Sequence, residues 1–121
     1  MTIDNEWKLL YSNNPKIQAF AVLKSGEIIW QTSNWDLVSV AKELSEASIK
    51  EIPRITISDV KYDRVTSSPE MYIASSENQG HLIMALVEKD AWVIAWATQD
   101  SAPELAVIDL SKLAVQLMRR L

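Results

Sequence analysis

The chain has 121 residues, of which 48% are hydrophobic and 23% charged, a balance typical of one folded domain (1–121) and too apolar for a disordered chain. Its net charge of −4 argues against nucleic acid as a partner, because that binding draws on clustered Lys and Arg. The absence of cysteine excludes disulfides, zinc–thiolate sites and cysteine nucleophiles. No secretory signal and no apolar stretch of about 20 residues is visible, so we expect a cytoplasmic protein that does not insert into a membrane.

The first 32 residues predict a helix followed by a β-hairpin. Within residues 2–13, Trp7 and Tyr11 fall on one helical face, and Pro15 prevents the helix from continuing. Residues 17–32 contain two runs of β-branched and aromatic residues on either side of Gly26, which is typical of a hairpin. The first of these runs is nearly all apolar, so we expect a strand covered on both faces.

Asn34 is a suitable cap for a second helix over residues 35–49, and this helix carries two apolar stripes. One stripe suffices to cover a sheet, so the second leaves a face that another surface could cover. An alternative is that the same face packs under residues 52–57 of this chain. The second stripe consists of Val38, Ala41, Ser45 and Ile49.

The second half of the chain predicts several strands and a closing helix. Strands are expected at 54–62, 71–75, 81–87 and 91–98, separated by turns rich in Ser, Pro, Asn and Gly. The run 92–97 is continuously apolar, so we expect it to lie centrally beside the first strand. In the closing helix Ser101 is the expected cap. One line of that helix is fully apolar, and a second line contains Leu105, Ile108, Lys112 and Val115.

Clusters of reactive side chains are missing, so we expect no catalytic residue, no metal site, no cofactor and no enzymatic activity. His81 is the only histidine, and it is more simply read as a residue at the start of a strand. Only Gly26 and Gly80 are present, too few for a Gly-rich phosphate loop. The carboxylate pairs at helical spacing are typical of solvated helix faces.

Tryptophan is the one enrichment, with five in the chain. Trp92 and Trp96 lie four apart on a strand and therefore share a face, which indicates the core. Trp7, Trp30 and Trp35 each read most simply as core residues, but an exposed pair among them would be a typical binding hot spot.

Two segments carry a family resemblance: the hairpin AFAVLKSGEII (19–29) and the later run from MYIAS (71–75) through GHLI (80–83) to WVIAW (92–96). In these segments and in element order, nearly the whole chain resembles the Roadblock/dynein light chain family. Two departures are an extended segment 55–65 and a longer closing helix. The resemblance implies an α+β fold with a five- to six-stranded, mainly antiparallel sheet, helices on both faces and the order α-β-β-α-β-β-β-α.

The Roadblock resemblance also implies a function, that of a homodimeric adaptor or scaffold that regulates a small Ras-like GTPase. Members of that family commonly dimerise through the second helix and the adjacent edge strand. Transferred to this sequence, the partners are a second copy of the chain and a GTPase. The dimer interface would contain Val38, Ala41, Ser45, Ile49 and Tyr72.

Two alternatives remain. Trp7, Tyr11 and Trp30 are similar to the aromatic peptide groove of the profilins, which bind actin and proline-rich peptides. The closing helix has no Tyr and the chain is shorter than most profilins, so this family is the second choice. A small-molecule sensor domain is the third hypothesis, and the polar groups that its pocket would need are Tyr62, Arg64, Tyr72 and His81.

Overall fold

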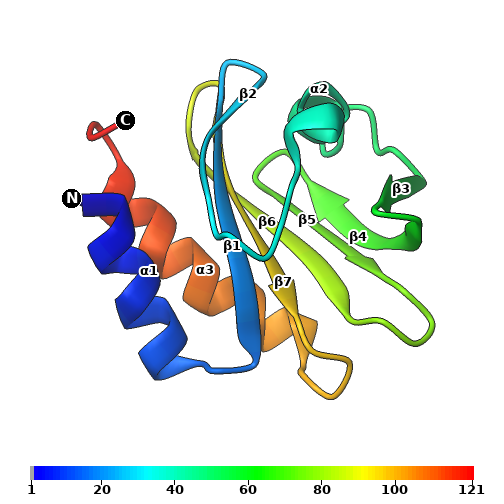
Figure 1. Ribbon diagram of the computed structural model, residues 1–121. Helices are drawn as coiled ribbons and strands as arrows, with labels where there is room; N and C mark the ends of the chain where they lie inside the picture. Colours follow the sequence, from blue (N-terminus) through cyan, green and yellow to red (C-terminus); the bar gives the residue numbers. More distant parts are fainter. Residues whose placement is uncertain (1) are drawn as a thin grey trace.

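The computed structural model describes residues 2–121, which form an antiparallel sheet of seven strands with helices on both faces (Figure 1). The α+β class expected from the sequence is confirmed, with seven strands in place of five or six. Across the sheet the strand order is β2-β1-β7-β6-β5-β4-β3. The elements are α1 (Thr2–Asn13), β1 (Ile17–Lys24), β2 (Glu27–Gln31), the 3₁₀ turn η1 (Val38–Val40), α2 (Ala41–Glu46), β3 (Arg54–Ile57), β4 (Val60–Ser68), β5 (Met71–Ser75), β6 (His81–Glu88), β7 (Ala91–Ala97) and α3 (Pro103–Leu117).

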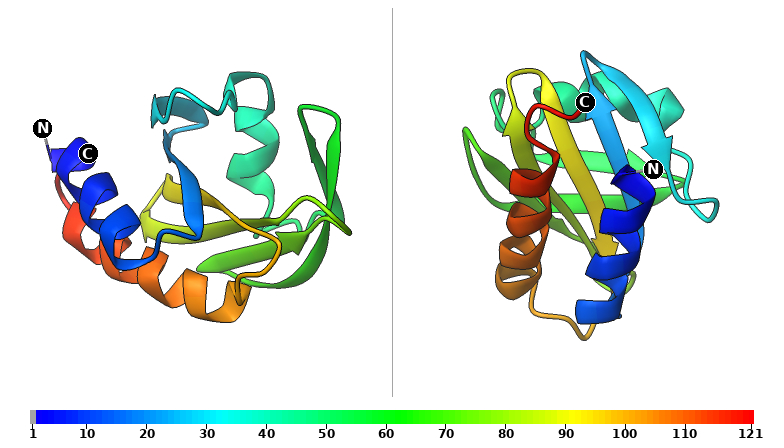
Figure 2. Two further views of the ribbon diagram at one scale, coloured as in Figure 1. Left: turned by 60° about the horizontal axis from the view of Figure 1, so that its bottom comes forward. Right: turned by 90° about the vertical axis from the view of Figure 1, so that its left-hand side faces the viewer.

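The sheet separates two apolar cores. Helices α1 and α3 lie side by side on one face, whereas α2 covers the other face of the curved sheet (Figure 2). Phe20 and Ile83 belong to the core under α1 and α3, and Leu44 and Met84 belong to the core under α2. Successive side chains of a strand point to opposite faces, so β1, β6 and β7 supply both cores. Strand β7 is apolar throughout, and β1 and β6 are apolar except near their ends. The expected central pairing of the first and last strands is confirmed.

Residues 54–62, expected as one strand, form a hairpin instead. Strands β3 and β4 are joined by Ser58 and Asp59, whose φ angles of +50° and +68° are both left-handed. Two left-handed residues make the turn that matches strand twist, and Asn-Gly or Asp-Gly usually supplies it. Ser-Asp gives no such signal, so the sequence analysis missed the turn. As a result five strands follow α2, where three or four were expected.

The second helix is much shorter than expected, because only the turn η1 and the six residues of α2 are helical. Asn34 does not cap it, because the residues before η1 and α2 are Leu37 and Val40. The side-chain amide of Asn34 donates to the Gln18 carbonyl at 2.9 Å. Asp36 instead accepts a hydrogen bond from the Val38 N–H at 3.1 Å. Beyond the helix, Glu51 adopts φ +49°, a left-handed angle that turns the chain toward β3.

Helix α3 shows the two lines that its sequence predicts. The line facing the sheet is buried and includes Leu110, Leu113 and Leu117. The residue before the helix is Ala102, and Ser101 does not cap it, because its hydroxyl donates to the Thr98 carbonyl at 2.7 Å. Across residues 2–121, none of the helices has the length and apolar character that crossing a membrane requires.

Candidate functional site

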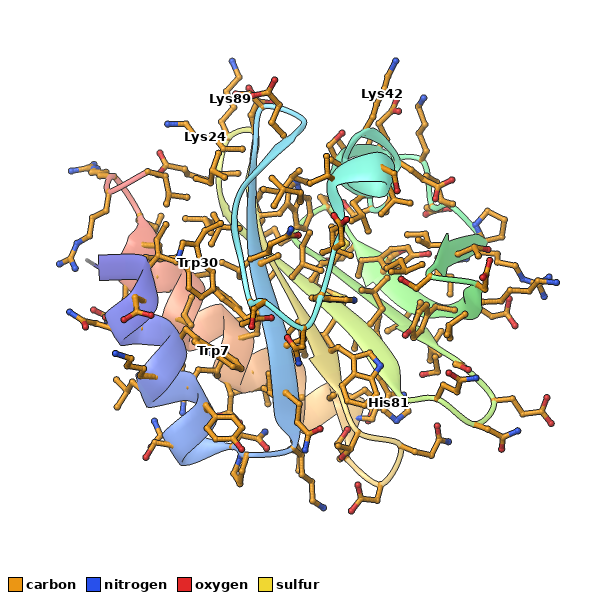
Figure 3. All side chains as sticks on the ribbon, in the orientation of Figure 1. Trp7, Lys24, Trp30, Lys42, His81 and Lys89 are labelled. Atoms are coloured by element: carbon orange, nitrogen blue, oxygen red, sulfur yellow. The ribbon has the colours of Figure 1, made fainter. Side chains whose placement is uncertain are left out.

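An aromatic cluster joins α1 to the first two strands. The Trp7 ring stacks on Phe20 of β1 with centroids 5.8 Å apart and planes only 7° from parallel. Tyr11 lies one helical turn further along, 5.7 Å from Trp7, and Trp30 of β2 lies 5.8 Å from Phe20. The cluster also fixes α1 on the sheet, because Trp7 is half-buried while Phe20 is fully buried. Figure 3 shows Trp7 and Trp30 on the same side of β1, close to α1.

A groove of about 580 Å³ opens beside this cluster. Trp7 and Tyr11 form its aromatic wall, and the segment after β2 forms the opposite wall. Hydrogen bonds hold that segment, since Phe20 N–H donates to the Thr32 hydroxyl at 3.2 Å and Asn34 is tied to β1. Trp30 does not line the groove, so the structure brings two of the three predicted aromatic residues into one binding site.

Helix α3 presents an exposed apolar row away from the sheet, which we call the outer row. Its members are Leu105, Ile108 and Val115, with exposed fractions of 63%, 51% and 62%. The helix already buries its other line, so folding does not require a second apolar row. The sequence predicts this line of residues on the helix but gives no function for it. A row of exposed apolar side chains on one helix face is the usual signal of a contact surface.

The strand face beside α3 is uncovered. Helix α3 packs on β5, β6 and β7 and leaves β3 and β4 bare on the same side of the sheet. Residues paired across neighbouring strands point to the same face of a sheet. Thr66 pairs with Ile73, which belongs to the core under α3, so Thr66 and the residues aligned with it point to the α3 side. The bare surface, which we call the β3–β4 face, is polar and exposed and consists of Arg54, Thr56, Lys61, Asp63, Thr66 and Ser68.

Charges on the β3–β4 face are of both signs. The Arg54 Nε donates to Asp63 Oδ1 at 2.6 Å. This hydrogen bond, more than the nearby positive charges, lowers the pKa of Asp63, and it also raises the pKa of Arg54. Both groups are therefore charged at neutral pH. A face with fixed charges of both signs suits a protein partner with complementary charges.

The residues expected at a dimer interface do not form one surface. Val38 and Ile49 are 64% and 76% exposed, but Ala41 and Tyr72 are buried in the core under α2. The Tyr72 hydroxyl donates to the Ile52 carbonyl at 2.5 Å, so it secures the chain before β3. Burial raises the pKa of Tyr72 to about 12. Buried side chains cannot contact a second protein, so the predicted interface was wrong for these two residues.

The polar groups proposed for a sensor pocket do not converge either. His81 is buried, with Nδ1 2.6 Å from the Ser75 hydroxyl and Nε2 3.3 Å from the Gln99 carbonyl. The Ser75 hydroxyl can donate to Nδ1 and the imidazole N–H can donate to Gln99, which satisfies both ring nitrogens. Arg64 is exposed on β4, whereas Tyr62 lines a pocket of about 300 Å³ on the α2 side of the sheet.

Comparison with known proteins identifies relatives. The sequence is 33% identical over 107 residues to the Thor profilin of a Thorarchaeota archaeon (strain AB_25), covering 85% of this chain and 84% of the relative. It is also 33% identical over 105 residues to the Odin profilin of Odinarchaeota yellowstonii (strain LCB_4), covering 85% and 87%. No protein-family model matches the sequence. Among solved structures, LokiProfilin2 in complex with rabbit actin superposes with a TM-score of 0.91 at 20% identity, covering 98% and 97% of the two chains.

These comparisons correct the expected Roadblock assignment. A Roadblock/LC7 domain from Streptomyces avermitillis superposes with a TM-score of only 0.62 at 12% identity, although it covers 94% of this chain. The second choice of the sequence analysis, a profilin-like chain, therefore fits better. The expected partners, a second copy of the chain and a small GTPase, are also wrong. The similar structures that were solved with a partner are complexes of a profilin with rabbit actin.

Proposed function

This chain belongs to the profilin family, and on that premise we propose that it binds monomeric actin through the outer row of α3 and the β3–β4 face. The likeness to a profilin solved with rabbit actin supports this choice of partner. Binding involves no chemical step, which agrees with a sequence that lacks clusters of reactive groups. The exposed apolar row is the observation that carries the choice of surface.

The two surfaces together have the composition of a protein interface. Stable interfaces bury about 800 Å² on each partner, with an apolar centre and a polar rim. The outer row supplies the apolar centre, with Ile108 in its middle. The β3–β4 face supplies the polar part on the same side of the sheet, including Lys61 and the Arg54–Asp63 pair. The aromatic groove is too small for a globular partner.

The proposal is tested by measuring the affinity for rabbit actin monomers, for example through inhibition of pyrene-actin polymerisation. We expect Ile108→Arg to weaken binding at least about tenfold, which corresponds to roughly 1.4 kcal/mol. Lys61→Glu reverses a charge on the neighbouring face and should weaken binding further in combination, with a larger effect at low salt. Both side chains are exposed, so neither change should affect folding.

The matched control is Ile49→Arg, which places the same charge on an exposed isoleucine on the α2 side of the molecule. It should bind actin like the unmodified protein. Binding that is lost with Ile49→Arg and kept with Ile108→Arg would move the interface to the α2 side. No actin binding by the unmodified chain would refute the function itself.

A second binding function rests on the aromatic groove at Trp7 and Tyr11. Extended proline-rich peptides dock on aromatic surfaces because their backbone is already ordered. The groove has one aromatic wall only, since the opposite wall consists of Thr32, Ser33 and Asn34. We therefore propose proline-rich peptide binding as a weaker activity of the same protein, at a site separate from the actin surface.

Titration with a polyproline decamer, followed by the indole signal of Trp7 in NMR spectra, tests this second function. Tyr11→Ala should abolish the change, whereas Tyr11→Phe should preserve most of it, because the ring and not the hydroxyl forms the wall. Tyr11 is 47% exposed, so neither variant should lose stability. Equal binding by both variants would show that the peptide does not use this groove.

A further inference from the structure

A second aromatic pocket opens on the α2 side of the sheet, on the face opposite Trp7 and the outer row. It has a volume of about 300 Å³ and lies beside β1 and β7, next to the turn between β3 and β4. Pockets of small-molecule ligands begin at about this size and often occur at the mouths of curved sheets. The side chains that define it are Asn34, Trp35, Ser58, Tyr62, Gln79 and Trp96.

The Trp96 wall of this pocket is held in place by several contacts. The Trp96 indole N–H donates to the Gln79 carbonyl at 2.9 Å. The ring lies directly on the backbone of Gly80, where an added Cβ would sit 2.6 Å from two ring atoms. Gly80 has φ +88°, an angle that glycine adopts without strain. The close approach of ring and backbone thus depends on glycine at this position.

The neighbouring loop is fixed by Gln99. Its side-chain oxygen accepts from the Gly80 N–H at 2.9 Å, and its amide donates to the Glu77 carbonyl at 3.2 Å. On the other side of the pocket, Ser58 lies in the tight turn with left-handed angles, and Asn34 is bonded to β1. The walls are therefore ordered without a ligand, which lowers the entropic cost of binding one.

The chemistry of the lining indicates an uncharged ligand. Of the described residues that line the pocket, none carries a formal charge at neutral pH. Burial raises the pKa of Tyr62, and the neighbouring Trp96 indole offsets this only in part, so the phenol stays neutral. The indoles of Trp35 and Trp96 favour a flat ring, because aromatic faces stack. The side chains of Asn34, Ser58 and Gln79 offer hydrogen bonds to ring heteroatoms.

We propose that this pocket binds an uncharged, planar nitrogen heterocycle of one or two fused rings, stacked on Trp35 and Trp96. The pocket has room for such a ring and no cationic side chain for a phosphate or carboxylate. This activity is separate from binding to actin. The pocket and the groove at Trp7 lie on opposite faces of the sheet and share one lining residue, Asn34, in the segment after β2. It gives this chain a small-molecule site of its own.

Adenine is a suitable probe, since it is uncharged at neutral pH, and AMP carries the same ring with a charged phosphate. Each tryptophan gives its own indole N–H signal in a ¹H–¹⁵N spectrum. We expect adenine to produce saturable shifts of the Trp35 and Trp96 signals and to leave those of Trp7 and Trp30 in place. AMP should bind more weakly than adenine.

Substitutions at the pocket complete the test. Trp35→Ala should weaken adenine binding by roughly 5- to 150-fold, the effect of losing one base–aromatic stacking contact, and Trp35→Phe should restore most of it. If Trp35→Ala perturbs the fold, Ser58→Arg blocks the mouth from an exposed position and should abolish binding.

The proposal is overturned if adenine leaves the Trp35 and Trp96 signals unchanged or moves those of Trp7 and Trp30 instead. Tighter binding of AMP than of adenine would contradict the uncharged ligand. Unchanged affinity in Ser58→Arg would show that the ring binds elsewhere.

Discussion

The contact between Trp96 and Gly80 makes a quantitative prediction, because the chain offers a matched control. Both glycines have left-handed φ angles, +88° for Gly80 and +79° for Gly26. A Cβ at Gly26 meets open space, whereas one at Gly80 lies 2.5 Å from the Ala97 carbonyl oxygen and 2.6 Å from the Trp96 ring. Substitution by alanine at either position incurs about 1–2 kcal/mol of backbone strain. Only Gly80→Ala adds overpacking, which costs about 1–3 kcal/mol.

Gly80→Ala should therefore lower the free energy of unfolding by about 2–5 kcal/mol, and Gly26→Ala by about 1–2 kcal/mol. Urea denaturation of both variants, followed by circular dichroism, measures the difference. The reduced freedom of the unfolded chain is the same in both variants and cancels. Equal destabilisation by the two substitutions would refute the close contact between the Gly80 backbone and the Trp96 ring.

Three further outcomes are expected. Tyr72→Phe should reduce stability by about 1–3 kcal/mol, because the Ile52 carbonyl loses its 2.5 Å partner, and thermal melting measures this loss. Burial raises the pKa of Tyr72 to about 12, so on raising the pH the unfolded chain loses the phenolic proton before the folded protein does. The free energy of unfolding should therefore fall between about pH 10 and pH 12, and it should fall less in Tyr72→Phe. Leu110→Ala should cost about 2–5 kcal/mol in urea titrations, whereas Leu105→Ala, at 63% exposure, should stay within about 0.5 kcal/mol and lower only the affinity for actin.

Several parts of the fold could be predicted because local patterns determine them. The bounds of α1, the central pairing of β1 with β7 and the division of α3 into a buried and an exposed line all follow from the spacing of apolar residues. The hairpin between β3 and β4 depends instead on left-handed backbone angles at Ser58 and Asp59, and this pair of residue types does not by itself predict such a turn. The start of α2 was also not predicted, because Asn34 bonds to the distant strand β1 and the helix begins only at Ala41.

The family was harder to predict than the fold, for a physical reason. Runs of apolar residues in β1, β6 and β7 indicate a sheet whose two faces are both covered by helices. Any family with this architecture needs the same runs, so they cannot distinguish a profilin from a Roadblock domain. The residues that point to a family are those with a second role. The proposed peptide groove would give Trp7 and Tyr11 such a role, but the strand pattern weighed more than these two residues in the family prediction.

The same distinction locates the functional surfaces on this chain. Folding accounts for Leu110 and Phe20, which are fully buried, but it does not account for an exposed Ile108 in the middle of a helix that is already packed. Trp35 and Trp96 pack on the core under α2, but their rings also line an open pocket with an uncharged lining. A soluble protein tolerates exposed apolar side chains singly, and a row or a pocket of them carries an aggregation risk that function must offset. Substitutions at exposed positions of these surfaces, such as Ile108 in the outer row and Ser58 at the Trp35 pocket, should therefore change binding while stability stays constant.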